Sequence, residues 1–436
     1  MSGLKAFIMA GGKGTRLREI TKDLLPKPMV MLKGKPLLQY AIESLRANGV
    51  DEVFISIGYM KDKIIEYFGE GERFGVKINY ITEEEPLGSG GALFYVKDKM
   101  DSDFIVCNGD ALFEIDIARM LEFHKKHNAI ATLLTHPNSH PFDSDLIMTD
   151  KENRVLEINK KGTVRDFYYK NNVNAGFFII NPKALYYFDT LKNVSMENDF
   201  IRKLIEDGKS VYAYKSPEYI RDVGTPERYY SATKDIDNGL PMKKCLKNKQ
   251  KAIFLDRDGV INEYVGYLRD EKQFKLIGDV ADSLKRLNKS GYLAIVVSNQ
   301  PVIARGECSF EMQDIIMNKM ETLLGECGAF VDGVYYCPHH PHSGFEGEVK
   351  ELKFDCECRK PKIGMLLKAV EDYNLDLSKC GIIGDTNVDI MTGKNAGIVQ
   401  IRVPSTSVDE YIEPCTYVAE NFTDAIDFVL EAERNE

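Results

Sequence analysis

The chain carries Phe7-Ile8-Met9-Ala10-Gly11-Gly12-Lys13-Gly14-Thr15-Arg16-Leu17 near its start, and this stretch decides the fold. A short apolar run gives way there to a loop rich in glycine, a residue that lets backbone N–H groups approach phosphate oxygens closely. Other apolar runs, such as Val53 to Ile57 and Phe104 to Cys107, recur along the chain with amphipathic stretches between them. This alternation predicts an α/β fold with a largely parallel sheet.

The length of 436 residues is enough for two or three domains. From about Asp235 to Lys251 the sequence turns polar and basic, as is typical of a linker, and a second strand-like run follows at Ala252 to Leu255. We therefore expect two α/β domains, with residues 1–238 in the first, 239–250 in the linker and 251–436 in the second.

Composition and charge exclude several classes of protein. The net charge of −10 argues against a surface that coats nucleic acid. No run of 18 apolar residues and no signal-like segment occurs, which predicts a cytoplasmic protein with no membrane contact. Nine cysteines are an odd number, so clustered cysteines are interpreted as metal ligands rather than as disulfides.

The glycine-rich loop has neither the spacing of a Walker A loop nor the third glycine of a dinucleotide fingerprint. Taken alone, it is also compatible with an ordinary tight turn. Arg16 and the later Pro26-Lys27-Pro28 favour a phosphate site, because a guanidinium and a rigidly held ammonium suit attack on an α-phosphate.

These residues resemble the sugar-1-phosphate nucleotidylyltransferases, over nearly all of roughly the first 230 residues. Four further segments match the family: Leu87-Gly88-Ser89-Gly90-Gly91-Ala92, Asn108-Gly109-Asp110, Val173-Asn174-Ala175-Gly176 and Arg221-Asp222-Val223-Gly224-Thr225-Pro226. The resemblance implies a Rossmann-like, GT-A-like domain in which a sugar phosphate attacks the α-phosphorus of a nucleoside triphosphate and expels pyrophosphate.

The same resemblance assigns roles to residues. It implies that Arg16 and Lys27 are catalytic and that Asp110 and Asp222 hold Mg²⁺, although either aspartate alone would pass for a turn or capping residue. The residues that it implies for substrate binding are Gly11, Gly12, Gly14, Thr15, Arg16, Lys27, Gly88, Asn108, Lys161 and Asn174. The chain departs from the family at one pair of residues: the family's Glu-Lys pair is Lys160-Lys161 here. The sugar hydroxyls that this chain recognises can therefore differ from those that the hexose enzymes recognise.

A second constellation begins at Asp256 and Asp258, which follow an apolar strand-like run and share one face of an extended chain. The carboxyl edge of a parallel sheet is where α/β proteins bind ligands. Three more polar segments follow: Ser298-Asn299-Gln300, Arg359-Lys360-Pro361 and Ile382-Ile383-Gly384-Asp385, with Asp389 beyond.

This order of motifs resembles the haloacid dehalogenase (HAD) superfamily of phosphatases, from about residue 251 to 430. The resemblance implies that Asp256 is the nucleophile and that Asp258 is the general acid and base. It also implies that Mg²⁺ is held by Asp256, Asp385 and the backbone carbonyl of Asp258, and that Ser298 and Lys360 neutralise the transferring phosphoryl group.

A third constellation predicts a structural zinc ion. Cys337, His339, Cys356 and Cys358 form two short clusters, each with ligands two residues apart. The alternate spacing favours His339 over His340 and His342, and the alternative is that the cysteines are reduced bystanders.

This loop, with Asp256-Arg257-Asp258-Gly259-Val260-Ile261-Asn262, Ile303-Ala304-Arg305-Gly306 and Cys358-Arg359-Lys360-Pro361, resembles the heptose 1,7-bisphosphate and histidinol-phosphate phosphatases. The resemblance implies that Ser298, Asn299, Arg305, Arg359 and Lys360 bind substrate, the two arginines holding the non-reacting phosphate. Pro301-Val302 departs from the small, flexible pair that is usual after Asn-Gln.

The two halves fit consecutive steps of nucleotide-activated heptose synthesis: loss of the 7-phosphate, then nucleotidyl transfer to the 1-phosphate. We expect GTP as the nucleotide, a phosphorylated heptose as the sugar, and no nucleic-acid or membrane partner; a homo-oligomer is left open. One alternative is a hexose-1-phosphate (mannose type) nucleotidylyltransferase fused to a phosphatase of other specificity, such as a histidinol-phosphate phosphatase. Another is a phosphosugar sensor without turnover, against which the retained Asp256, Asp258, Lys360 and Asp385 speak.

Overall fold

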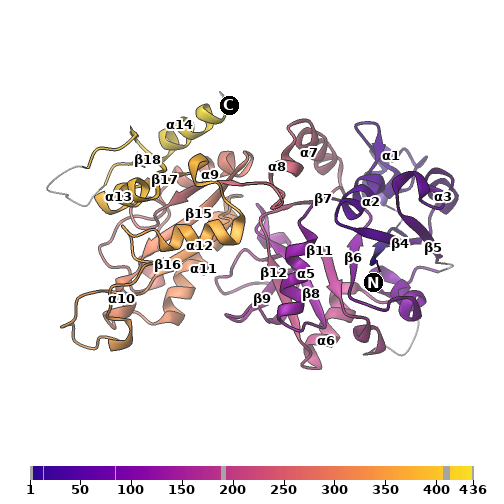
Figure 1. Ribbon diagram of the computed structural model, residues 1–436, viewed down its shortest axis with the longest axis horizontal. Coiled ribbons are helices and arrows are strands. Elements are labelled where there is room, and N and C mark those ends of the chain that lie inside the picture. The colour runs from indigo at the N-terminus through magenta and orange to yellow at the C-terminus, as the bar shows by residue number, and fades with distance from the viewer. Residues whose placement is uncertain (1–2, 13, 84, 188–192, 406–412, 435–436) are drawn as a thin grey trace. The chain divides into compact units, whose positions relative to one another are not determined.

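The computed structural model describes residues 3–12, 14–83, 85–187, 193–405 and 413–434. Lys13 of the glycine-rich loop therefore lies outside the described residues (Figure 1). Contacts between Cα atoms divide the chain into two compact units. The first comprises Met1–His136, Asp145–Lys160 and Val173–Cys245, and the second comprises Pro137–Ser144, Lys161–Asn172 and Leu246–Glu436.

The first unit is built on a mixed sheet in which, among the described residues, nine strands take part. Its main path runs β10-β9-β11-β6-β1-β4-β5, and β8 joins β11 to β12. The strands are β1 (Leu4–Met9), β4 (Val50–Ile57), β5 (Lys77–Thr82), β6 (Phe104–Asn108), β8 (Ala131–His136), β9 (Leu146–Thr149), β10 (Val155–Asn159), β11 (Val173–Ile180) and β12 (Val211–Lys215). Two small ribbons pair β2 (Met31–Leu32) with β3 (Lys35–Pro36) and β7 (Ala111–Glu114) with β13 (Tyr219–Asp222).

The sheet is less uniformly parallel than the alternation of apolar runs predicts. β1 runs parallel to β4 and β6, whereas β11 runs antiparallel to β6 and β8. Apolar periodicity reports burial on a face and carries no information on strand direction, so it cannot distinguish the two arrangements.

Helices cover the first sheet on both faces, as the two-residue period of a strand requires. Ala6 and Ile8 of β1 pack into one buried cluster with helices α2, α3 and α5, while Phe7 between them packs into the other. The helices of this unit are α1 (Arg18–Thr21), α2 (Leu37–Ala47), α3 (Lys61–Phe68), α4 (Gly88–Gly91), α5 (Ile117–Lys126), α6 (Arg202–Glu206), α7 (Pro226–Asp237) and α8 (Leu240–Lys243).

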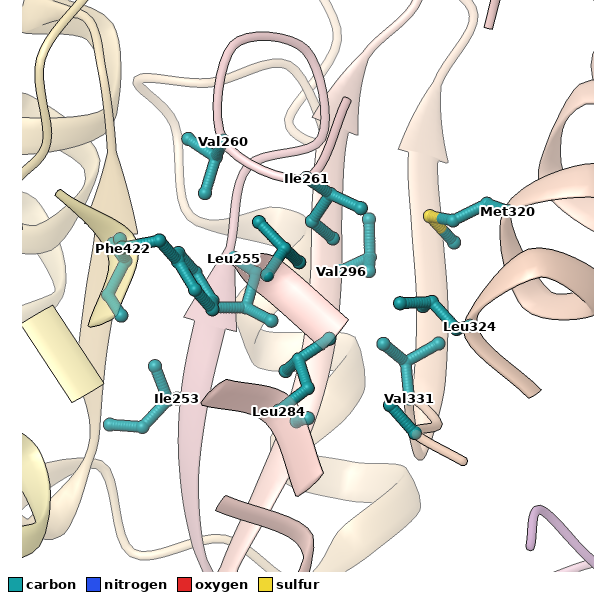
Figure 2. Packing of buried hydrophobic residues seen from close by; sticks show 14 of the residues in the cluster. Ile253, Leu255, Val260, Ile261, Leu284, Val296, Met320, Leu324, Val331 and Phe422 are labelled. Carbon is teal, nitrogen blue, oxygen red and sulfur yellow. The ribbon is translucent and has the colours of Figure 1, made fainter. Parts of the chain in front are cut away.

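The second unit has a parallel sheet in the order β16-β15-β14-β17-β18-β19. Its strands are β14 (Lys251–Leu255), β15 (Tyr292–Asn299), β16 (Gly333–Cys337), β17 (Gly381–Gly384), β18 (Val399–Arg402) and β19 (Tyr417–Val418). Its helices are α9 (Val280–Asn288), α10 (Pro301–Ala304), α11 (Phe310–Glu326), α12 (Gly364–Tyr373), α13 (Asn387–Ala396) and α14 (Phe422–Arg434). Figure 2 shows Leu255 of β14 packed with Leu284 of α9 and Phe422 of α14 in the larger of its two cores.

Two segments that lie between strands of the first sheet in sequence belong to the second unit. Within that unit, the backbone N–H of Tyr169 donates to Thr322 Oγ1 of α11 at 2.9 Å, and that of Asn171 donates to Glu321 Oε2 at 2.8 Å. No helix in the described ranges combines the length and the apolar character that crossing a bilayer requires.

Candidate functional site

The glycine-rich loop follows β1, and Gly14 at its end precedes a short helical turn, η1 (Thr15–Leu17). Gly14 has a φ of +62°, and a Cβ added there would lie 2.6 Å from Lys27 Cβ. Only glycine fits such a position, because both the backbone angle and the space exclude a side chain. Thr15 and Arg16 follow at once and are exposed, so they are free to meet a ligand at the loop.

Lys27 lies buried where the loop meets two carboxylates. It starts η2 (Lys27–Met29) after Pro26, and its Nζ donates to Asp110 and, at 3.4 Å, to Asp222. The two aspartates meet because β7 and β13 pair antiparallel, with Asp222 opposite the residue that follows Asp110. Arg228 of α7, which belongs to none of the motifs above, pairs with Asp222 at 2.7 Å.

The donor set of this site fits a hard divalent cation. Asp110 and Asp222 offer only carboxylate oxygens. Their side chains are 28% and 41% exposed, which leaves room for water and phosphate oxygens as further ligands. Mg²⁺ prefers this combination.

The predicted sugar end of the site gathers around a bulge in β11. Gly176 has a φ of +68°, and a Cβ there would lie 2.3 Å from Nδ2 of Asn108. The predicted residues Asn108 and Asn174 lie near this bulge on the neighbouring strands β6 and β11. Gly88, with a φ of +73°, starts α4 and packs against the backbone of Val194. Lys160 and Lys161 are exposed in the loop after β10.

Glu197 is a carboxylate near the predicted sugar end of the site that no sequence motif predicts. It lies in the first turn of the π-helix η7 (Met196–Ile201), and its oxygens lie 3.5 Å from Asn174 Nδ2 and from Ser195 Oγ. Burial raises its pKa, with a further rise from Asp145, and the hydrogen bonds only partly offset these effects. An acidic residue in the first turn of a helix is too common to be a signal on its own.

The second site forms where parallel strands end side by side. Asp256 follows β14, Ser298 lies near the end of β15 and Asp385 follows β17. Lys360 lies between two acids: its Nζ is 2.7 Å from Asp256 Oδ1 and 2.6 Å from Asp389 Oδ1, and all of these groups are buried.

Burial and charge act against each other in this cluster. Burial raises the pKa of Asp256, and the Lys360 ammonium lowers it again. Burial alone would lower the pKa of Lys360, but the carboxylates of Asp256 and Asp389 outweigh it and raise that pKa above its ordinary value. The ion pair therefore keeps Lys360 charged beside the predicted nucleophile.

The carboxylates of Asp256, Asp385 and Asp389 are close enough to share a metal ion, with ligand atoms within 4.8 Å of one another. Asp385 Oδ1 is buried and has no hydrogen-bond partner among the described residues, which suits a metal ligand. A Cβ at Gly259 would lie 2.4 Å from Asp385 Oδ2. Of the predicted ligands, Asp256 and Asp385 are in this group; Asp258 was predicted through its backbone carbonyl and is not part of the carboxylate cluster.

The carboxylate of Asp258 is held by three neighbours. Arg257, which is fully buried, donates from Nη2 to both oxygens at 2.8 and 2.7 Å. Gln300 Nε2 donates to Oδ2 at 2.8 Å, and Asn262 Nδ2 donates to Oδ1 at 3.1 Å. Burial would raise the pKa of Asp258, but Arg257 and the two amides together lower it.

The other predicted phosphate residues differ in what they touch. Asn299 exchanges two hydrogen bonds of 3.0 Å with the backbone of Lys360, so it positions that lysine. Arg359 donates to the backbone oxygen of His339 at 3.2 Å. Arg305 pairs with Glu307 at 2.8 Å, and its guanidinium lies over the ring of Tyr267.

Cys337, His339, Cys356 and Cys358 converge at the end of β16 into one cluster. The three sulfurs lie 3.2 to 3.4 Å apart, and His339 Nδ1 is 3.3 Å from Cys358 Sγ. These separations are far longer than the ~2.0 Å of a disulfide. They approach the roughly 3.8 Å between sulfurs around one tetrahedral ion at ~2.3 Å. His340 instead bonds the backbone oxygen of His342, so the cluster contains His339 alone of the three histidines.

Comparison with known proteins matches both units to families. The model of the nucleotidyl transferase family matches residues 5–239, and that of the HAD-hydrolase-like family matches residues 357–425. These matches confirm both predicted reaction classes.

Three individual proteins are similar to parts of the chain. D-glycero-alpha-D-manno-heptose 1-phosphate guanylyltransferase of Aneurinibacillus thermoaerophilus is 35% identical over 237 residues, which cover 54% of this chain and 99% of the relative. Mannose-1-phosphate guanylyltransferase of Mycobacterium tuberculosis is 32% identical over 244 residues, or 56% of this chain and 67% of the relative. A crystal structure of D,D-heptose 1,7-bisphosphate phosphatase from B. bronchiseptica is 25% identical, with a TM-score of 0.37, and covers 42% of this chain and 99% of that one.

Proposed function

We propose that this chain, which belongs to the nucleotidyl transferase family, catalyses two consecutive steps in the synthesis of a nucleotide-activated heptose. In the first step, the phosphatase domain removes the 7-phosphate of D-glycero-D-manno-heptose 1,7-bisphosphate. In the second step, the transferase domain moves GMP from GTP to the resulting heptose 1-phosphate and releases pyrophosphate. The observation that carries the proposal is the presence of two separate catalytic constellations on one chain, around Lys27 and around Asp256. A nucleoside triphosphate as substrate favours action in the cytoplasm.

The transferase reaction follows from the charges around the glycine-rich loop. The triphosphate binds at the backbone N–H groups of the loop, and Arg16 and Lys27 neutralise the charge that develops at the α-phosphate. The sugar phosphate, held by Asn174, supplies the attacking oxygen. Asp110 and Asp222 would hold Mg²⁺, which supplies further neutralisation of phosphate oxygens when bound. The 35% identity to a heptose 1-phosphate guanylyltransferase supports heptose and GTP.

The phosphatase reaction uses Asp256 as a nucleophile. An oxygen of its carboxylate bonds to phosphorus as the bond to the sugar oxygen breaks. Asp258, which must carry a proton when the sugar phosphate is bound, gives that proton to the leaving oxygen. A water molecule, deprotonated by Asp258, then cleaves the aspartyl phosphate and restores Asp256. Lys360, which pairs with Asp256, and Ser298, near the end of the neighbouring strand, would stabilise the phosphoryl oxygens. Asp256 and Asp385 would hold Mg²⁺ beside this group.

The thiolate-rich cluster is proposed to hold zinc in a structural role. Three sulfurs and one imidazole nitrogen suit a soft tetrahedral ion and leave no open position for chemistry. Its position directly before Arg359 and Lys360 in the chain indicates that the ion stabilises the segment that carries those two residues.

A second candidate is a mannose-1-phosphate guanylyltransferase fused to a phosphatase of other specificity. The 32% identity to such a guanylyltransferase favours it, and all the catalytic residues named above would be unchanged. The exposed Lys160, in place of the family's sugar-reading carboxylate, speaks against a hexose.

The decisive experiment supplies the purified chain with heptose 1,7-bisphosphate and GTP in the presence of Mg²⁺. We expect inorganic phosphate to appear first and pyrophosphate with GDP-heptose to follow. Mannose 1-phosphate, histidinol phosphate and the other nucleoside triphosphates are tested in parallel. Preferential use of mannose 1-phosphate, without release of phosphate from the heptose bisphosphate, would contradict the proposal and support the second candidate.

A further inference from the structure

Gln300 is a buried residue to which the proposed reaction assigns no role. Its side chain, 2% exposed, lies between the proposed general acid and a proposed phosphate ligand: Nε2 is 2.8 Å from Asp258 Oδ2 and 2.8 Å from Ser298 Oγ. We propose that Gln300 is a positioning residue that directs the Ser298 hydroxyl toward the phosphoryl group and holds Asp258 for proton transfer. The inference rests on the proposed phosphatase function.

The chemistry of an amide fixes the direction of both hydrogen bonds. The NH₂ group of Gln300 has two hydrogens to donate, and an ionised carboxylate can only accept. Arg257 donates to both oxygens of Asp258, so both oxygens act as acceptors in this structure. The reversed amide would bring its oxygen against this carboxylate, so the nitrogen must face Asp258.

The second hydrogen of the same NH₂ group then goes to Ser298 Oγ. A hydroxyl that accepts a hydrogen bond from Gln300 keeps its own hydrogen for another acceptor. Ser298 is 1% exposed and lies near the end of β15, at the sheet edge where Asp256 and Lys360 also lie. At that edge the acceptor in the reaction is a phosphoryl oxygen, so Gln300 makes Ser298 a donor before the substrate arrives.

The backbone around Gln300 holds this geometry. Its N–H donates to the carbonyl of Cys337 on the neighbouring strand at 2.8 Å, and Pro301 starts α10 directly after it. The carboxylate of Asp258 is fixed by Arg257 and Asn262 as well, so losing Gln300 removes one of the two donors to Oδ2 without releasing the whole group.

Two separable effects are expected in Gln300→Leu. The Ser298 hydroxyl can turn away from the phosphate, which weakens binding of inorganic phosphate about tenfold, as loss of one hydrogen bond to a charged group does. A displaced Asp258 slows cleavage of a phosphate whose leaving oxygen needs a proton, by about 10²-fold. A phosphate with an acidic phenol as leaving group needs no such proton to form the aspartyl phosphate, so release of the phenol in the first turnover should be affected far less.

The experiment uses the full chain with Mg²⁺ and compares the first-turnover rates of heptose 1,7-bisphosphate and p-nitrophenyl phosphate. Calorimetry measures the affinity for inorganic phosphate. Gln313→Leu is the matched control, because Gln313 is fully buried on α11 and its amide has no hydrogen-bond partner among the described residues. Gln300→Glu is a second variant of nearly the same shape that removes the NH₂ group, and it serves if Gln300→Leu does not fold.

A larger loss on the sugar phosphate than on p-nitrophenyl phosphate, together with weaker phosphate binding and an unaffected Gln313→Leu, supports the inference. Equal losses on both substrates, or unchanged phosphate affinity, would overturn it, since either is what a general packing defect produces. If the wild-type chain hydrolyses neither substrate, the proposed function fails. The phosphate titration of wild type against Gln300→Leu then still decides the role of Gln300.

Discussion

The ammonium of Lys27 lies 3.4 Å from the carboxylate of Asp222, although 195 residues separate them in the chain. The same ammonium also bonds Asp110, so one buried cation joins the two acids that are proposed to hold Mg²⁺. A charge in this position is available to a triphosphate at the glycine-rich loop, because Gly14 packs directly on the stem of Lys27.

Replacing Lys27 with alanine should therefore cripple nucleotidyl transfer. Loss of one fixed charge at the α-phosphate should lower kcat for pyrophosphate release by about 10²- to 10³-fold. Release of phosphate from heptose 1,7-bisphosphate should stay near wild type, and Lys126→Ala, an exposed lysine of α5, is the control. Equal damage to both activities would mean that the two sites do not work independently.

Replacing Asp256 with asparagine should abolish phosphate release while leaving pyrophosphate formation from supplied heptose 1-phosphate intact. The amide cannot form the aspartyl phosphate, and we expect a loss of at least ~10³-fold, measured by phosphate release under saturating Mg²⁺. Asp282→Asn, an exposed acid of α9, should retain both activities. Residual phosphatase activity near wild type would exclude Asp256 as the nucleophile.

The sequence predicted the parts of the sites that follow strand ends. Asp256 and Asp385 converge because the carboxyl ends of parallel strands lie at the same edge of a sheet. An acidic residue that directly follows a short apolar run is therefore expected at that edge. Lys360 could be predicted only through its family motif, since no strand carries it.

Side-chain networks were outside the reach of sequence patterns. Arg257 directly precedes Asp258, and Gln300 reaches it from the end of β15, and nothing in their spacing distinguishes these contacts from those of ordinary neighbours of a motif. The position of Glu197 could not be predicted for the same reason, because its approach to Asn174 depends on how η7 packs beside β11. Strand direction in the first sheet was also beyond a pattern that records only burial.

Glu197→Gln should stabilise the protein at neutral pH. Burial raises the pKa of Glu197 above its ordinary 4.5, so the folded state binds this proton more tightly than the unfolded state does. Its contribution to stability is then fully present below about pH 4.5 and is lost as the pH rises through the folded-state pKa.

The thermal midpoint of Glu197→Gln should therefore exceed that of wild type at pH 7, and the difference should shrink toward pH 4. Glu206→Gln, an exposed acid of the nearby α6, should show no such trend. A Glu197→Gln protein that is less stable than wild type at pH 7 would contradict the argument, because it would mean that the charged carboxylate is favoured in the folded state.

The cluster of Cys337, His339, Cys356 and Cys358 should hold a zinc ion. Metal analysis should find about one tightly held zinc ion per chain beside exchangeable Mg²⁺, since thiolates select the softer ion and carboxylates the harder one. Cys356→Ser should lose that zinc and lower the unfolding midpoint of the phosphatase domain by several degrees. Cys327→Ser, an exposed cysteine outside the cluster, should keep both zinc and stability.

Phosphatase activity should fall with the zinc, through two residues that the cluster holds in place. Arg359 donates to the backbone oxygen of His339, and Lys360 follows it toward Asp256, so disorder of the loop displaces the ammonium beside the nucleophile. Chelation should act slowly, and added Mg²⁺ should not reverse it, because a closed site supplies folding energy rather than chemistry. Nucleotidyl transfer should be spared. A zinc-free preparation with full phosphatase activity would show that the cluster does not support the site.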